Sequence, residues 1–238
     1  MKKFLAAATA LLLTLCMMAG CSQQPSDNSG ASGTSGASDV PAVTEVSAIS
    51  KAEDLVGKTI GVQLGTTGMT YAEEIEGATV EKYNKGADAV EALKQGKVDA
   101  VLIDSSPAKY FVEKNPELSI LPDPFAEEQY AIAIKKGRDD LTQQINDALD
   151  QLRQDGTLEL IEQNWLVDEE YGKHPYESQE GVEYDGEIVM ATNAEFPPYE
   201  LKEEGVIKGF DVDMMKAVCD ILGKKLVIDD MAFDSVIE

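Results

Sequence analysis

The 238-residue chain has 44 acidic and 20 basic side chains, which gives a formal net charge of −24. Nucleic acids and anionic membrane surfaces would repel such a chain, so the charge argues against both as partners. The single histidine, His174, excludes a metal cluster of several histidines, and its place in a segment without periodicity argues against a Ser/His/Asp or Cys/His catalytic arrangement. We therefore expect no metal, no cofactor and no enzymatic activity.

The chain begins with a predicted signal peptide, residues 1–20, in which two lysines precede a short apolar run and small residues. Met18-Ala19-Gly20-Cys21 resembles a lipobox, in which cleavage would leave Cys21 as a diacylated N-terminal residue. An ordinary signal with an incidental cysteine is the alternative. Residues 21–44 are rich in Ser, Gly, Asn and Asp, which predicts a flexible linker. We expect an exported lipoprotein on the outer face of the cell membrane.

Residues 45–129 alternate short apolar runs with helical periods. This alternation is typical of βαβ units on a largely parallel sheet and predicts one α/β lobe. The predicted strands are KTIGVQLG, TVEKYN, DAVLID and LSILPD, and the predicted helices are TYAEEIEG, GADAVEALKQGK and SPAKYFVEKNP.

Residues 130–166 begin with YAIAIKKG, which predicts a strand, and continue with two helices. The first helix has one apolar face and ends at Gly156; the second is LELIEQNWL. The apolar face of the first helix consists of Leu141, Ile145, Leu149 and Leu152. Residues 167–186 collect Gly, Pro and acids without periodicity, which predicts a connector.

Residues 187–238 predict a strand, a helix and a strand: EIVMATN, GFDVDMMKAVCDILG and KLVIDDMAF. The buried side of the helix would hold Val212, Met215, Val218, Cys219 and Leu222. Cys219 is expected to fill the core rather than to act as a nucleophile. The last residues, DSVIE, read as the start of a further helix.

Two loops offer complementary charges. Gly65, Thr66 and Thr67 lie between a strand and a helix, where backbone amides favour an anion such as a carboxylate; a plain strand-to-helix turn is the alternative. Asp104 ends a strand and could accept a ligand's ammonium group, or equally serve as a helix cap. Together the loops would suit a zwitterionic α-amino acid.

Two aromatic residues could cover the apolar stem of a small ligand. In ATNAEFPPYE, Asn193 follows a strand and Phe196 precedes two prolines, and Phe233 follows the last predicted strand. Each phenylalanine could equally cap the core of its own lobe.

Several blocks together resemble one family, the solute-binding proteins of polar amino-acid ABC transporters, which are periplasmic binding proteins of the second type. The blocks are GFDVDMMKAVCDIL, GKTIGVQLGTTG, GKVDAVLIDSSPA, YAIAIKKG and LRQDGTLELIEQNW. The resemblance implies a two-lobed α/β Venus-flytrap that closes on an amino acid and serves a membrane permease. It also implies ligand contacts at Asn193 and Phe196, at Phe233, at Gln63, Thr66 and Thr67, and at Asp104 for the amino group. Asn193 stands where many relatives have an acid, which puts recognition of a basic or amide side chain in question.

The order of these blocks departs from the family. The ATNAEFPPYE-like block comes first there and last here, so we expect a circularly permuted chain in which residues 167–186 join the family's end to its beginning. The family continues after the DSVIE-like position to an arginine that binds the ligand carboxylate, so we also expect an incomplete first lobe. A non-transporting remnant or sensory module is the alternative function, and a dehydratase-like enzyme on the same fold is a further one.

Overall fold

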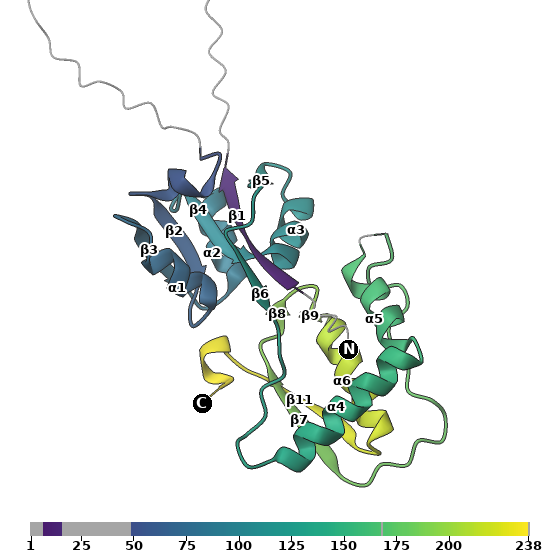
Figure 1. The fold of residues 1–238 in the computed structure, drawn as a ribbon. Helices are drawn as coiled ribbons and strands as arrows, with labels where there is room; N and C mark the ends of the chain where they lie inside the picture. The colour runs from purple at the N-terminus through teal and green to yellow at the C-terminus, as the bar shows by residue number, and fades with distance from the viewer. Residues whose placement is uncertain (1–6, 16–48, 168, 238) are drawn as a thin grey trace, which may run out of the picture.

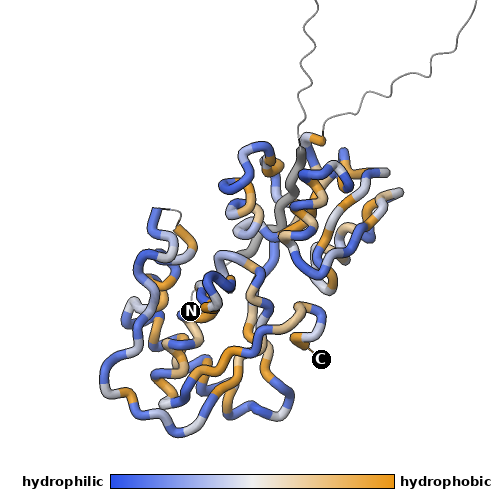
Figure 2. The backbone as a smooth tube through the Cα atoms, turned by 180° about the vertical axis from the view of Figure 1, so that it is seen from behind, coloured by the Kyte–Doolittle hydropathy of each residue, from blue (hydrophilic) through white to orange (hydrophobic). Residues whose placement is uncertain are grey.

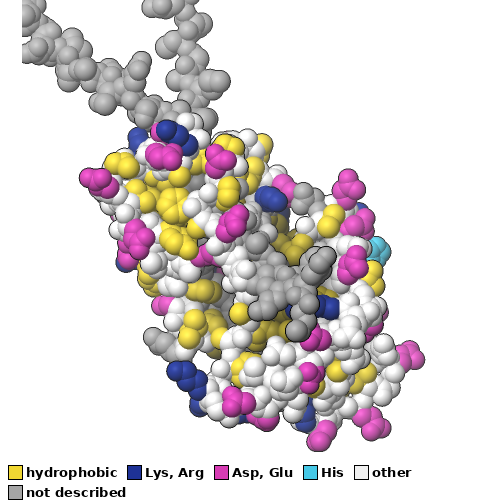
Figure 3. Space-filling view, viewed as in Figure 1, with side chains coloured by type: hydrophobic (Ala, Val, Ile, Leu, Met, Phe, Trp, Pro, Cys, Tyr) yellow, Lys and Arg dark blue, Asp and Glu magenta, His cyan; other side chains and the backbone are white. Residues whose placement is uncertain are grey.

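The computed structural model describes residues 7–15, 49–167 and 169–237, and it has two lobes (Figure 1). The predicted linker and lipidation site, Cys21, lie outside the described residues. Within those three ranges, no helix has the length and apolar character that crossing a bilayer requires. On the face seen in Figure 3, acidic side chains are scattered over both lobes, as the net charge implies.

The second lobe contains a six-stranded sheet in the order β3-β2-β4-β1-β5, with β6 also paired to β1. Its strands are β2 (Thr59–Gln63), β3 (Thr79–Tyr83), β4 (Ala100–Asp104), β5 (Leu118–Ile120) and β6 (Ala126–Gln129). Strand β2 pairs in parallel with β3 and β4, as the alternation of strands and helices predicted.

Strand β1 (Ala7–Leu15) comes from the predicted signal peptide. It runs antiparallel to β4, with Ala10 opposite Asp104 and Thr14 opposite Ala100. It also pairs antiparallel with β5 and β6, so it joins β4 to both. Sequence analysis gave this segment no place in the sheet, because its apolar run followed by small residues had been assigned to export.

Both faces of this sheet are covered at β4, so its first four residues, 100–103, are buried. Ala100 and Leu102 point into a core with β2 and the 3-10 helix η1 (Ala52–Leu55), whereas Val101 and Ile103 pack against the other core. The helices of the lobe are α1 (Thr67–Glu73), α2 (Gly86–Lys94) and α3 (Ser105–Lys114). In Figure 2 the hydrophobic positions gather on the strands and on the inner sides of the helices.

The first lobe is built from segments on both sides of the connector. Its helices are α4 (Asp139–Gln154), α5 (Thr157–Leu166) and α6 (Phe210–Ile221), and its parallel strands are β7 (Glu187–Thr192) and β11 (Lys225–Asp230). A core of side chains from α4, α5 and α6 surrounds Trp165, which is 2% exposed. The predicted apolar faces of α4 and α6 both turn into this core, and Cys219 is buried there.

The connector is fastened to the first lobe. The indole Nε1 of Trp165 and the backbone N–H of Tyr176 both donate to Oδ2 of Asp213, at 2.6 and 2.9 Å. The backbone N–H of His174 donates to Oδ1 of Asn164 at 2.6 Å. Residues 169–186 contain neither helix nor strand, as predicted, and these bonds give them a fixed path.

Two predictions for the first lobe are wrong. YAIAIKKG, from Tyr130, forms no strand, because the residues that the structure describes include no strand beside it. DSVIE does not begin an α-helix; the short 3-10 helix η2 (Phe233–Ser235) lies there. Sequence analysis also missed the small antiparallel sheet of β8 (Glu195–Phe196), β9 (Glu200–Glu203) and β10 (Val206–Lys208).

Candidate functional site

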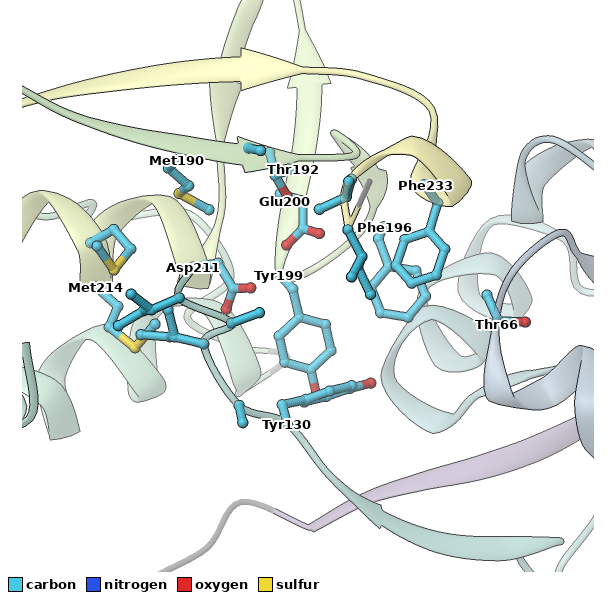
Figure 4. Close-up of a pocket in the computed structure, with 18 of the residues that line it drawn as sticks. Thr66, Tyr130, Met190, Thr192, Phe196, Tyr199, Glu200, Asp211, Met214 and Phe233 are labelled. Atoms are coloured by element: carbon cyan, nitrogen blue, oxygen red, sulfur yellow. The ribbon is translucent and has the colours of Figure 1, made fainter. Parts of the chain in front are cut away.

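A cavity of about 880 Å³ lies between the two lobes. Residues from β4, α1 and the start of the 130–135 segment line one side, and residues from β7, α4, α6 and η2 line the other. Figure 4 shows Met190 and Met214 at one end and Phe196, Phe233 and Thr66 at the other. The volume suits a small organic ligand. Among the described residues, no group of three or more His, Cys, Asp or Glu is arranged to hold a metal ion.

Most of the predicted ligand residues lie at this cavity. Gln63, Thr66, Thr67, Asp104, Phe196 and Phe233 line it, whereas Gly65 and Asn193 are not among its lining residues. Gly65 has a φ of +81° and lets the chain turn from β2 into α1. Added side-chain atoms there would meet Asp234, so the first-lobe segment around η2 lies close to this loop.

The two threonines use their hydroxyl groups inside the protein. Thr66 caps α1: its oxygen accepts a bond from the N–H of Met69 at 3.2 Å and its hydroxyl donates to the carbonyl of Gln63 at 2.8 Å. The hydroxyl of Thr67 donates to Oε2 of Glu128 at 2.9 Å. Both residues therefore fix the loop, and any ligand contact from Thr67 would compete with Glu128.

Asp104, expected to accept the ligand's ammonium group, already has a partner. The hydroxyl of Tyr130 donates to Oδ2 of Asp104 at 2.5 Å. Burial raises the pKa of Asp104, and the Tyr130 bond opposes that rise. Burial and the neighbouring Asp104 carboxylate raise the pKa of Tyr130 far above its usual value. Asp104 is thus an acceptor whose present donor, the neutral hydroxyl of Tyr130, could be replaced by a cationic group of a ligand.

Direct contacts between the lobes flank the cavity. Nε2 of Gln63 donates to Oδ1 of Asn193 at 3.1 Å, which joins the two loops that were predicted to hold the ligand. Nδ2 of Asn193 also donates to the carbonyl of Met231, so both the oxygen and the nitrogen of its side-chain amide are hydrogen-bonded. Lys85 and Glu195 form an ion pair at 2.7 Å across the same boundary.

An aromatic group crosses the middle of the cavity. The rings of Phe196 and Tyr199 stack with centroids 5.8 Å apart, and Tyr130 meets Tyr199 edge to face at 4.9 Å. The hydroxyls of Tyr199 and Ser106 lie 3.2 Å apart and bridge the lobes. Phe196 also packs against the core of the second lobe. Phe196 thus lines the cavity and covers the core of the opposite lobe rather than the core of its own lobe, and its contact with a ligand stays a prediction.

Gly209 brings two carboxyl groups together behind Tyr199. A Cβ atom at Gly209, where φ is +141°, would lie 2.2 Å from the carbonyl oxygen of Tyr199, so only glycine lets α6 approach the start of β9 this closely. The N–H of Asp211 donates to that carbonyl at 2.9 Å. Asp211 therefore lies next to Glu200, and Figure 4 shows their carboxyl groups near one another in the cavity.

Burial dominates the protonation of this pair. Burial and the neighbouring Asp211 raise the pKa of Glu200 well above its usual value, and burial raises the pKa of Asp211 to about 6. A hydrogen bond between the two carboxyl groups contributes to both pKa shifts, and a hydrogen bond with Thr192 opposes the rise in the pKa of Glu200. Oε2 of Glu200 is buried and accepts no hydrogen bond from a donor among the described residues.

Four of the cavity residues that the sequence did not point to are Tyr130, Tyr199, Glu200 and Asp211. The strings ATNAEFPPYE and GFDVD contain three of them, but charge and aromaticity there gave no sign of which side chains face inward. The glycine before the FDVD run was the available signal, because a glycine at a helix start can mark a close backbone approach.

Residues 188–238 match the sequence model of the bacterial extracellular solute-binding proteins, family 3. This part of the chain is therefore similar to that family. The L-cystine-binding protein TcyJ of Escherichia coli K12 is 33% identical over 120 residues, which cover 50% of this chain and 45% of TcyJ. The arginine-binding extracellular protein ArtP of Bacillus subtilis is 34% identical over 129 residues, covering 52% of this chain and 50% of ArtP. The chain thus spans about half the length of the curated relatives it matches.

Solved structures agree on the α/β fold of a type 2 periplasmic binding protein. The P235GK mutant of ArgBP from T. maritima is 30% identical with a TM-score of 0.53, covering 68% of this chain and 59% of that one. An ancestral arginine-binding protein bound to arginine is 29% identical with a TM-score of 0.52, covering 67% and 61%. These relatives are named as binding proteins, which agrees with the expectation of a binding function rather than an enzymatic one.

Proposed function

We propose that this chain is the extracytoplasmic binding component of an ABC importer, which binds a polar amino acid between its lobes and delivers it to the permease. The observation that carries the proposal is the cavity between the lobes, which six of the eight predicted ligand residues line. The named relatives, described as cystine-binding and arginine-binding proteins, support an amino acid as the ligand. The lipobox-like sequence before Cys21 supports a lipid anchor at the membrane that holds the permease.

Within the site, we propose that Asp104 receives the ligand's ammonium group in place of Tyr130. The loop of Gln63 to Thr67 would face the ligand from the same lobe, with Asn193 placed through its bond to Gln63. Phe196 and Phe233 would cover the aliphatic part.

The permuted order is part of this proposal. Residues 139–166, which resemble the family's end, and residues 187–230, which resemble its beginning, pack into one core, and the connector runs along the same lobe. Such packing is what a join between the family's end and its beginning requires, and a join of this length costs little loop entropy.

A thermal-shift screen of the purified chain against the twenty amino acids tests the proposal. A ligand at a hundred times its dissociation constant stabilises the folded state by about 2.7 kcal/mol. Replacing Asp104 by Ala removes a charge-assisted bond of about 1.5–3 kcal/mol, so calorimetry should show an affinity about ten- to hundredfold lower. Asp147→Asn, an exposed acid on α4, is the matched control. If no amino acid shifts the melt, or if Asp104→Ala binds as well as the unaltered chain, the proposal is wrong.

A further inference from the structure

The carboxylate of Asp104 lines the cavity, yet a donor from the protein already occupies it. Its Oδ2 accepts a hydrogen bond from the hydroxyl of Tyr130 at 2.5 Å, and Tyr130 lines the same cavity. Among the residues that the structure describes, no lysine or arginine forms an ion pair with Asp104. A partly buried carboxylate needs a donor, and Tyr130 is the one that the fold supplies.

The donor is neutral, so the charge of Asp104 remains uncompensated. Burial and the neighbouring Asp104 carboxylate raise the pKa of Tyr130 far above its usual value, so its hydroxyl keeps the proton at neutral pH. A hydroxyl satisfies the hydrogen-bonding capacity of the carboxylate but adds no attraction between opposite charges. An ammonium group at the same place would supply both.

Tyr130 lies where its side chain can leave without disrupting a core. It follows β6 directly and begins residues 130–138, which cross to α4 of the first lobe without helix or strand. The side chain is 43% exposed and belongs to none of the three hydrophobic cores of the described residues. Its ring meets Tyr199 edge to face, with centroids 4.9 Å apart (Figure 4). Its place therefore depends on that ring contact and on the bond to Asp104.

We propose that Tyr130 is an internal competitor of the ligand: its hydroxyl occupies Asp104 in the empty cavity, and binding must displace it. The inference rests on the proposed function and adds how the affinity of that site is set. Each binding event breaks the bond between Tyr130 and Asp104, so the free energy of this bond is subtracted from the free energy of binding. Removing the hydroxyl alone should therefore raise the affinity.

Tyr130→Phe tests the inference, because phenylalanine keeps the ring against Tyr199 and removes the hydroxyl. The twenty amino acids are screened by thermal shift on the variant and on the unaltered chain, and calorimetry gives the dissociation constant of each one that binds. We expect that constant to fall by about three- to tenfold in the variant, as the loss of one competing hydrogen bond predicts.

Tyr184→Phe is the matched control. The hydroxyl of Tyr184 also donates to an aspartate, Oδ1 of Asp220, at 2.8 Å, and the side chain is 45% exposed. Tyr184 does not line the cavity. Its variant should leave every dissociation constant within about twofold of the unaltered value.

A second measurement needs no ligand. Burial raises the pKa of Asp104 and the bond from Tyr130 opposes that rise, so the pKa should increase further in Tyr130→Phe and stay constant in Tyr184→Phe. Carboxyl-carbon NMR titration of the ligand-free chains measures it. An Asp104 pKa that Tyr130→Phe leaves unchanged would mean that the contact is absent in solution, and the inference would be wrong.

The outcomes separate this inference from the proposed function. If an amino acid binds Tyr130→Phe as weakly as the unaltered chain, or more weakly, Tyr130 does not compete; the inference is wrong and amino-acid binding stands. If an amino acid binds the variant alone, the inference is supported, although the proposed function fails for the unaltered chain. If no amino acid binds either protein, both fail.

Discussion

Strands β4 and β7 are both mostly apolar, but they differ in their surroundings. β4 reads AVLID and β7 reads EIVMAT, and both were predicted as strands of an α/β sheet. β4 lies between β2 and β1 with both faces covered, and its Leu102 is 1% exposed. β7 pairs with β11 alone among the described strands, and its Val189 is 62% exposed.

The difference shows where each lobe obtains its stability. In the second lobe, two cores lie against the central sheet, so apolar strand residues are buried on both faces. In the first lobe, the main core lies among α4, α5 and α6, and the sheet contributes chiefly Ile188, Met190 and Leu226 from one face. An apolar strand sequence becomes a core only when neighbouring elements cover it.

Removing residues 1–20 should change the difference in protection between β4 and β7 most. A chain that begins at Cys21 lacks β1, so β4 would become an open edge of the second-lobe sheet and β5 would lose the strand with which it pairs. We expect the amides of β4 and β5 to exchange at least about tenfold faster in hydrogen-exchange experiments, because local opening becomes easier. The amides of β7 should keep their rates. Unchanged exchange in β4 and β5 would show that β1 adds nothing to the sheet.

Two side-chain substitutions, one on β4 and one on β7, test how much each strand's burial contributes to stability. Leu102→Ala removes a buried side chain from β4 and should lower the free energy of unfolding by about 2–5 kcal/mol. Val189→Ala on β7 should change it by less than about 0.5 kcal/mol, because the side chain is exposed. Denaturant titration measures both. Equal losses would mean that β7 is covered in solution and that the comparison is wrong.

The smallest effect concerns the carboxyl pair of the first lobe. Asp211 has a pKa of about 6 when folded and about 3.9 when unfolded, so the folded state holds more protons between these values. As pH rises from 4 to 7, this group lowers the stability of the unaltered chain, by about 2 kcal/mol in total. Asp211→Asn should remove that loss, so its stability relative to the unaltered chain should rise with pH. Asp147→Asn should not change the slope of stability with pH in this way, and a constant difference for Asp211→Asn would contradict the prediction.

Much of the second lobe was predictable from local pattern. Predicted strands and helices match β2 to β5 and α1 to α3, because each combines a local period with a turn residue at its end. In the first lobe the same reasoning succeeded for α4 to α6 and failed for YAIAIKKG from Tyr130. Helices satisfy their own backbone hydrogen bonds, whereas a strand needs a partner that local sequence does not reveal.

The residues of the site divide in the same way, into those that local sequence indicates and those that only tertiary packing brings together. The predicted ligand residues lie in loops at the carboxyl ends of strands, and that position is readable from strand order, so six of them reached the cavity. Tyr130, which bonds to Asp104, could not be chosen from the sequence because the two residues are 26 positions apart and meet only through tertiary packing. Glu200 and Asp211 meet for a similar reason, through the close backbone approach that Gly209 allows.

The sequence by itself determined the acidic surface, the alternation of strands and helices, and the loops from which six of the cavity's lining residues come, because charge, hydrophobic period and turn chemistry are local properties. Only the tertiary structure decided that residues 7–15 lie in the sheet, that residues 130–135 do not form a strand and that Glu200 and Asp211 share the cavity with Asp104. These outcomes depend on which segments become neighbours. Strand pairing, burial and pKa are all set by neighbours that lie far apart along the chain.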